Sequence, residues 1–191
     1  GNGGSYVVFG KTDGAAISIA TLTGGTPAGG FAINAVGTAD MSGFDVSYAG
    51  DINGDGLADL IVSSSVADPT GLTDAGKSYV VFGKTDTAAI SLTNIAAGSG
   101  GFVINGQAAS DALGASATYA GDLNGDGYDD LLVTASYADP VVGGTALANA
   151  GKTYVIYGGP QFISGNVALA TGTSADEYVV GTNGTDTLIG G

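Results

Sequence analysis

One nine-residue segment occurs twice in the chain, and this repeat restricts the possible folds more than any other feature of the sequence. Residues 51–59, called loop 1, are Asp-Ile-Asn-Gly-Asp-Gly-Leu-Ala-Asp; residues 122–130, called loop 2, are Asp-Leu-Asn-Gly-Asp-Gly-Tyr-Asp-Asp, 71 positions later. Oxygen-bearing side chains occupy positions 1, 3, 5 and 9 of both loops, and glycine occupies position 6. A segment that returns at a fixed spacing predicts a fold built from repeated units.

The spacing of these oxygen atoms predicts a calcium-binding loop. Calcium takes about six to eight oxygen ligands, and a glycine at position 6 permits the sharp turn that brings them together. The backbone carbonyl of position 7 supplies a further ligand, so that side chain is free to vary. The ligands predicted for about two ions are Asp51, Asn53, Asp55, Leu57 and Asp59 in loop 1, and Asp122, Asn124, Asp126, Tyr128 and Asp130 in loop 2. The alternative is a turn that binds no ion, because Asn-Gly and Asp-Gly are common turn dipeptides.

The segments around the loops exclude an EF-hand. An EF-hand has a bidentate Glu at position 12 and a helix on each side, whereas position 12 here is Val62 or Val133. The same position argues against a dockerin. The flanking segments, 45–50 and 60–63 around loop 1 and 116–121 and 131–134 around loop 2, are apolar and β-branched. They predict strands, so each loop is expected to join two strands.

Further segments repeat with the loops, at spacings of 71 to 75 residues. A Tyr-Val segment begins at residues 5, 78 and 153, and the stretch at 30–34 returns at 101–105. With the Tyr-Val strand as its start, each cycle holds about four short strands. We therefore predict an all-β chain of propeller-like blades, each with four antiparallel strands, as a partial propeller of about two complete repeats plus partial ones.

Composition restricts the function. Eighteen acidic residues stand against four lysines and no arginine, a formal charge of −14, which argues against nucleic acid and anionic membranes as partners and favours divalent cations. A halophile's acidic surface is the competing explanation. Without His or Cys, the common nucleophilic triads and zinc chemistry are excluded from these residues. One Glu, Glu177, is present, and the adjacent acids Asp129 and Asp130 fall inside loop 2, so we predict no enzymatic activity.

Several of these motifs resemble FG-GAP repeats, the blades of the integrin α-subunit propeller and of many bacterial surface and secreted proteins. The resemblance is carried by residues 9–10, 82–83 and 157–158 (Phe-Gly or Tyr-Gly), by Ala-Gly-Lys at 75–77 and 150–152, and by the two loops. It covers residues 1–160. It implies that the ten ligands named above bind calcium ions that stiffen the blades and take no part in catalysis. The Tyr at 157 and the triplets Asp-Ala-Gly and Asn-Ala-Gly depart from the family pattern.

Residues 161–191 are expected to form a short β-rich extension. Residues 181–189 resemble one nonapeptide of the RTX calcium repeat, with Thr182 in place of the second glycine; a plain turn between two strands is the alternative. The RTX resemblance implies a large bacterial protein exported by a type I system. The chain shows neither a signal peptide nor an apolar run long enough for a transmembrane segment, and we expect it to be an internal part of a longer polypeptide.

Together these features predict a non-enzymatic, calcium-stabilised extracellular or cell-surface module for adhesion, surface structure or assembly. Its partner is expected to be a protein or glycan bound through the blade loops, or further copies of the chain. The alternative function is a scaffold or accessory domain of a secreted hydrolase. Two cycles do not close a ring, so the missing blades are expected elsewhere in the same polypeptide, with associating copies or an open array as alternatives. Tyr48 and Tyr119, three residues before each loop, form either an aromatic ligand platform or a contact between blades.

Overall fold

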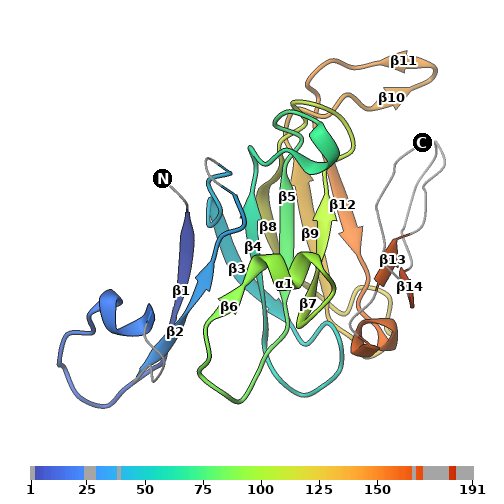
Figure 1. Cartoon of the computed structure of the whole chain (residues 1–191). Helices are drawn as coiled ribbons and strands as arrows, with labels where there is room; N and C mark the ends of the chain where they lie inside the picture. Colours follow the sequence, from blue (N-terminus) through green and yellow to red (C-terminus); the bar gives the residue numbers. More distant parts are fainter. Residues whose placement is uncertain (1–2, 24–28, 38–39, 165–166, 170–180, 184–191) are drawn as a thin grey trace.

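The computed structural model describes residues 3–23, 29–37, 40–164, 167–169 and 181–183. Most of its strands belong to three sheets that follow one another along the chain (Figure 1). The first sheet contains β1 (Gly4–Val8), β2 (Gly30–Asn34) and β6 (Ile90–Ser91); the central sheet contains β3 (Asp45–Gly50), β4 (Asp59–Ser64), β5 (Lys77–Val81) and β7 (Gly101–Asn105); the third sheet contains β8 (Leu113–Gly121), β9 (Asp130–Ala135) and β12 (Lys152–Ile156).

Shorter elements lie between the strands of these sheets and after β12. Two small hairpins are formed by β10 (Val141–Val142) with β11 (Thr145–Ala146) and by β13 (Val167–Leu169) with β14 (Gly181–Asn183). The helical elements are α1 (Leu92–Ala96) and the 3-10 turns η1 (Ile19–Thr23), η2 (Pro69–Gly71) and η3 (Pro160–Ser164). No helix in the described ranges is long and apolar enough to cross a membrane.

The central sheet is a four-stranded antiparallel blade, with strand order β3-β4-β5-β7. It confirms the predicted architecture, but it corrects where a unit begins. The sheet starts with the strand that precedes loop 1, whereas the sequence predicted a cycle that starts at the Tyr-Val strand. A periodic sequence fixes the length of the unit and leaves its starting point open. Among the described residues, the central sheet is therefore the one complete blade, flanked by two partial ones.

The strands form where β-branched and apolar residues were expected. The predicted strand 45–50 matches β3 in full, and the repeated stretches 30–34 and 101–105 form β2 and β7. The short helix α1 was not predicted, since five residues are too few to show helical periodicity. It begins at Ser91, whose side chain accepts a hydrogen bond from the Thr93 N–H at 3.3 Å, and it buries Leu92 and Ile95.

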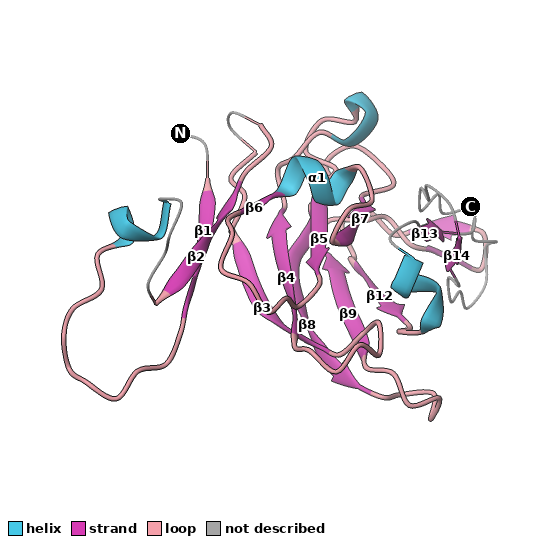
Figure 2. Ribbon diagram, turned by 60° about the horizontal axis from the view of Figure 1, so that its bottom comes forward, coloured by secondary structure: helices cyan, strands magenta, loops and turns pink. Residues whose placement is uncertain are grey.

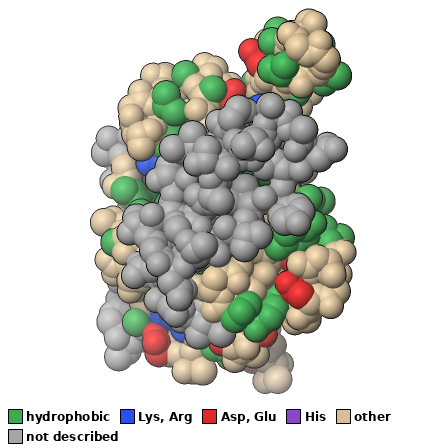
Figure 3. Space-filling view, turned by 90° about the vertical axis from the view of Figure 1, so that its right-hand side faces the viewer, with side chains coloured by type: hydrophobic (Ala, Val, Ile, Leu, Met, Phe, Trp, Pro, Cys, Tyr) green, Lys and Arg blue, Asp and Glu red, His purple; other side chains and the backbone are tan. Residues whose placement is uncertain are grey.

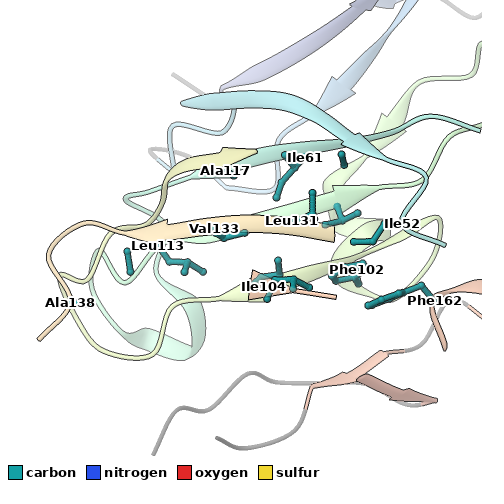
Figure 4. Packing of buried hydrophobic residues seen from close by; sticks show 14 residues of the cluster. Ile52, Ile61, Phe102, Ile104, Leu113, Ala117, Leu131, Val133, Ala138 and Phe162 are labelled. Atoms are coloured by element: carbon teal, nitrogen blue, oxygen red, sulfur yellow. The ribbon is translucent and has the colours of Figure 1, made fainter. Parts of the chain in front are cut away.

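The core lies on both faces of the central sheet. Side chains alternate across a strand, so Ile61 and Val80 point toward the third sheet while Val62 and Val81 point toward the first. Figure 4 shows the larger cluster, in which residues of the central and third sheets and Phe162 of η3 pack together. Burial of these apolar side chains is the main favourable contribution that holds the sheets against one another.

The first sheet is covered less completely than the third. Strand β1 pairs with β2, and β2 pairs in parallel with β6, which comes from the connection between β5 and β7 (Figure 2). In the other two sheets the equivalent of β1 has a hairpin beside it: β3-β4 beside β5, and β8-β9 beside β12. At the corresponding place next to β1 lies an open groove of about 580 Å³, lined by β1 and the β3-β4 hairpin.

Little of the predicted extension at 161–191 falls within the described residues. Part of it forms η3, β13 and β14. The RTX-like nonapeptide begins in β14, and its remaining residues, 184–189, lie outside the described residues. The proposed boundary at residue 160 and the RTX resemblance therefore stay predictions.

Candidate calcium loops

Both loops occupy the same place in their sheets. Loop 1 joins β3 to β4 and loop 2 joins β8 to β9, as the flanking strands predicted. The glycines at position 6, Gly56 and Gly127, have φ angles of 84° and 90°, in the left-handed region that favours glycine. The sharp turn expected at this position is confirmed in both copies.

The two loops share one set of internal hydrogen bonds. In loop 1 the Asp51 carboxylate accepts from the N–H groups of Asp55 and Gly56 at 3.0 and 2.9 Å, and the Asn53 amide donates to Asp55 at 3.0 Å. In loop 2 the Asp122 carboxylate accepts from Asp126 and Gly127 at 3.1 and 2.9 Å, and Asn124 donates to Asp126 at 2.9 Å. The Asp at position 5 also accepts from the N–H of position 7 in each copy. The repeat therefore extends from the sequence to the turn geometry.

The aspartate at position 9 connects each loop to a later strand. Asp59 accepts hydrogen bonds from the N–H groups of Ile52 at 2.9 Å and Gly83 at 2.7 Å, and its side chain is fully buried. Asp130 is equally buried and accepts from Leu123 at 2.6 Å and Gly158 at 2.9 Å. The donors Gly83 and Gly158 are the glycines of the Phe-Gly and Tyr-Gly pairs. The hydrogen bond to position 9 was not predicted, although one such pair follows each loop, with its glycine 24 residues after Asp59 and 28 residues after Asp130.

These glycines fit closely against the loops. A Cβ atom on Gly83 would lie 2.6 Å from the Leu57 Cβ and 2.7 Å from the Ala58 carbonyl oxygen. On Gly158 it would lie 2.3 Å from the Asp129 carbonyl oxygen. Glycine is therefore needed there because the backbone of the loop approaches closely.

Negative charge accumulates in loop 1. Burial raises the pKa of Asp59 to about 6. The N–H groups of Gly83 and Ile52 lower this pKa, and repulsion from Asp55 and Asp51 raises it. In loop 2 the pKa of Asp122 is lowered, first by the Gly127 N–H and also by those of Gly125 and Asp126. Loop 1 thus holds carboxylates close enough to repel one another, a condition that a bound cation relieves.

The residues present fit the ligand chemistry of calcium. The carboxylates that accept N–H bonds keep further lone pairs, since an ionised carboxylate has about four acceptor sites. Across the described ranges, no group of three or more Asp, Glu, His or Cys side chains is arranged to hold a metal ion. The three carboxylates predicted for each loop are therefore not gathered around one point, and the fit to calcium is one of ligand type. The ten ligand assignments remain predictions.

The two tyrosines before the loops contact each other across neighbouring sheets. The ring centroids of Tyr48 and Tyr119 are 5.2 Å apart, with the planes tilted by 57°. Half of Tyr48 stays exposed, and the Tyr119 hydroxyl donates to Asp129 at 3.1 Å, which raises the pKa of Tyr119. Of the two predicted roles, the pair performs the contact between blades, as a ring pair at favourable distance.

A family model for the FG-GAP repeat matches residues 47–81 and 114–156. The chain contains two FG-GAP repeats. Each matched stretch includes one of the two loops and the Tyr-Val strand that follows it, which confirms the resemblance predicted from the sequence. No curated protein matched the chain.

FG-GAP repeats are typical of extracellular or cell-surface proteins and are structural or adhesive repeats, not enzymes. The repeats imply a β-propeller-like fold, which the described sheets form without closing a ring. On the face shown in Figure 3, the charged side chains of the described residues are scattered and form no single patch.

Proposed function

We propose that the chain is a non-enzymatic, calcium-stabilised module of a larger secreted or surface protein, acting in adhesion, surface structure or assembly. The observation that carries the proposal is the set of hydrogen bonds that loops 1 and 2 share, together with the buried carboxylates at position 9. One ion in each loop would neutralise carboxylates that repel one another, and would thereby stabilise the hairpins β3-β4 and β8-β9.

The residues that would hold the ions are the five predicted in each loop. The side chains at positions 1, 3 and 5 already turn toward their own loop backbone, and Asp59 and Asp130 close the loop from the start of the next strand. Bound calcium supplies positive charge and no catalytic chemistry in this proposal.

A thermal melt in excess EDTA and in millimolar calcium tests the proposal. Calcium at a hundredfold excess over Kd stabilises the folded chain by about 2.7 kcal/mol for each site. For a chain of this size, that raises Tm by roughly 5–10 °C for each site. An Asp55→Ala, Asp126→Ala double variant should lose the increase.

The matched control is the Asp68→Ala, Asp139→Ala double variant. These residues also occupy equivalent positions in the two repeats, where each carboxylate accepts a backbone N–H in a turn, from Asp74 and Asn149. The control removes the same number of charges and should keep the calcium response. A Tm that is equal in EDTA and calcium would contradict the proposal.

The adhesive part of the proposal needs a separate measurement. Binding of the full-length parent protein to glycan arrays and to cell surfaces, with and without calcium, would identify a partner. Absence of binding by a parent protein that still responds to calcium would exclude adhesion and leave surface structure or assembly. Hydrolysis of a polymer by the parent would instead favour the accessory-domain alternative.

A further inference from the structure

The two loops differ chemically at position 8, which supplies no predicted calcium ligand. Loop 1 has Ala58 there, exposed to solvent, whereas loop 2 has Asp129, which is half-buried. The Asp129 side chain leaves its own loop and reaches loop 1. Its Oδ2 accepts the backbone N–H of Asp51 at 2.7 Å, and its own N–H donates to the Asp51 carbonyl at 3.4 Å.

Asp51 is the residue that organises loop 1. Its carboxylate accepts the N–H groups of Asp55 and Gly56, and it is the first predicted calcium ligand of the loop. The Asp129 carboxylate is held in turn by the Tyr119 hydroxyl, through Oδ1 at 3.1 Å. The bond from Asp129 to Asp51 therefore fixes the start of loop 1 from the neighbouring sheet.

A second link joins the carboxylates at position 9. Asp130 of loop 2 accepts the Gly158 N–H at 2.9 Å, and the next residue, Gly159, donates its N–H to the Ile52 carbonyl at 2.9 Å. The Ile52 N–H donates to Asp59 of loop 1. An unbroken series of hydrogen bonds and peptide units thus connects Asp130 to Asp59.

The loops also pack against each other directly. The Tyr128 ring lies over Gly54, where an added Cβ atom would be 2.4 Å from the ring. Tyr128 is the position whose carbonyl is a predicted ligand in loop 2. A shift of the loop 2 backbone at Tyr128 therefore moves the ring that contacts Gly54 of loop 1.

We propose that Asp129 is a positioning residue that couples the two loops, so that calcium binding at one loop increases the affinity of the other. This inference rests on the proposed calcium function. An ion in loop 2 orders that loop, holds Asp129 more firmly on the Asp51 N–H, and so prepares the ligands of loop 1 before a second ion arrives. By linkage, an ion in loop 1 strengthens binding in loop 2 by the same factor.

The experiment is a calcium titration followed by NMR of the amides of Gly56 and Gly127. Each amide donates to the first aspartate of its own loop, so the two signals report the two sites separately. Asp126→Ala, which disables loop 2, should weaken calcium binding at loop 1 by a factor between about 5 and 150, the usual range for coupled sites. In a chain that already carries Asp129→Ala, adding Asp126→Ala should leave the calcium affinity of loop 1 unchanged.

A measurement without calcium tests the contact itself. In EDTA, hydrogen exchange of the Asp51 amide should accelerate in Asp129→Ala, because the amide loses its acceptor. Asp139→Ala is the matched control, since its carboxylate also accepts one backbone N–H, that of Asn149 at 2.6 Å. The control should change neither the exchange of the Asp51 amide nor the coupling between the sites.

The outcomes separate the two proposals. If both sites bind calcium and Asp126→Ala leaves loop 1 unchanged, the coupling is overturned and the calcium function stands. Coupling that persists in Asp129→Ala would overturn the role of Asp129. If neither glycine signal responds to calcium, the calcium function and the coupling both fail.

Discussion

The central sheet has two interfaces built from equivalent residues, and they are not equally closed. Toward the third sheet, Phe102 stacks on Phe162, with ring centroids 4.5 Å apart and planes within 16°. Toward the first sheet, the equivalent Phe31 instead has the Lys84 ammonium 4.6 Å from its ring centroid. The two phenylalanines are almost equally buried, so the interfaces differ here in what covers the ring.

The larger difference between the interfaces lies beside β1, at the open groove. At the interface with the third sheet, the hairpin β8-β9 buries Ala117, Leu131 and Val133 against the central sheet. At the interface with the first sheet, no hairpin of the described residues lies beside β1, and Tyr6 and Val8 remain 43% and 51% exposed. The comparison shows that the hairpin carrying the loop is also the part of each blade that closes the interface to its neighbour.

The largest expected effect compares two leucines at the same repeat position. Leu131 of β9 is fully buried against the central sheet, while Leu60 of β4 faces the first sheet and is half-buried. Leu131→Ala should lower the free energy of unfolding by about 3–5 kcal/mol, as a cavity in a closed core does. Leu60→Ala should cost about 1–2 kcal/mol, because the side chain is still partly in water. Urea denaturation measures both, and equal losses would contradict the comparison.

A smaller effect is expected from pH, through the buried carboxylate that starts β4. The pKa of Asp59 is raised from 3.8 to about 6, so folding favours its neutral form. The neutral Asp59 carboxyl contributes to the free energy of unfolding below about pH 4, and this contribution is lost as pH rises through about 6. In EDTA, the wild-type chain should therefore lose up to about 3 kcal/mol between pH 4 and 7 relative to Asp59→Asn.

Subtracting the free energy of unfolding of Asp59→Asn from that of the wild-type chain at each pH removes the contribution of the other acids. The first sheet has no loop of this kind among its described strands, so the pH effect should belong to the hairpin of the central sheet. Millimolar calcium should flatten the difference, because a cation favours the ionised carboxylate. A difference that stays constant with pH in EDTA would show that Asp59 is ionised at no cost.

The smallest effect compares two glycines of the Phe-Gly pairs. Gly83 lies against loop 1, whereas an added Cβ on Gly10 would meet nothing within 4 Å. Gly83→Ala should destabilise the chain by about 1–3 kcal/mol through overpacking, and Gly10→Ala should change stability by less than about 0.5 kcal/mol. Thermal melts of the two variants measure the contrast. A large loss at Gly10 would mean that the first sheet is more closely packed than its groove indicates.

Much of this fold could be predicted from the sequence, because many strands are rich in apolar and β-branched residues and return at a regular spacing. Loops 1 and 2 and their flanking strands followed from spacing alone. The role of Phe162 could not be predicted, since it lies beyond the last repeated motif and has no equivalent to compare. The contact of Asp129 with Asp51 was also missed, because a search for ligands gives no weight to position 8. The difference between Ala58 and Asp129 was the available signal.

The parallel pair between β2 and β6 has a consequence for the order of folding. Ile90 and Ser91 pair with Ile33 and Asn34, yet they lie between β5 and β7, two neighbouring strands of the central sheet. A chain emerging from its N-terminus can form the β1-β2 hairpin early, but β2 gains its second neighbour only after β5 has been made. Such long-range pairing slows folding and makes it cooperative. The first and central sheets should therefore resist pulling forces as one unit, because separating them breaks the pairing of β2 with β6, and β6 is joined by the chain to two strands of the central sheet.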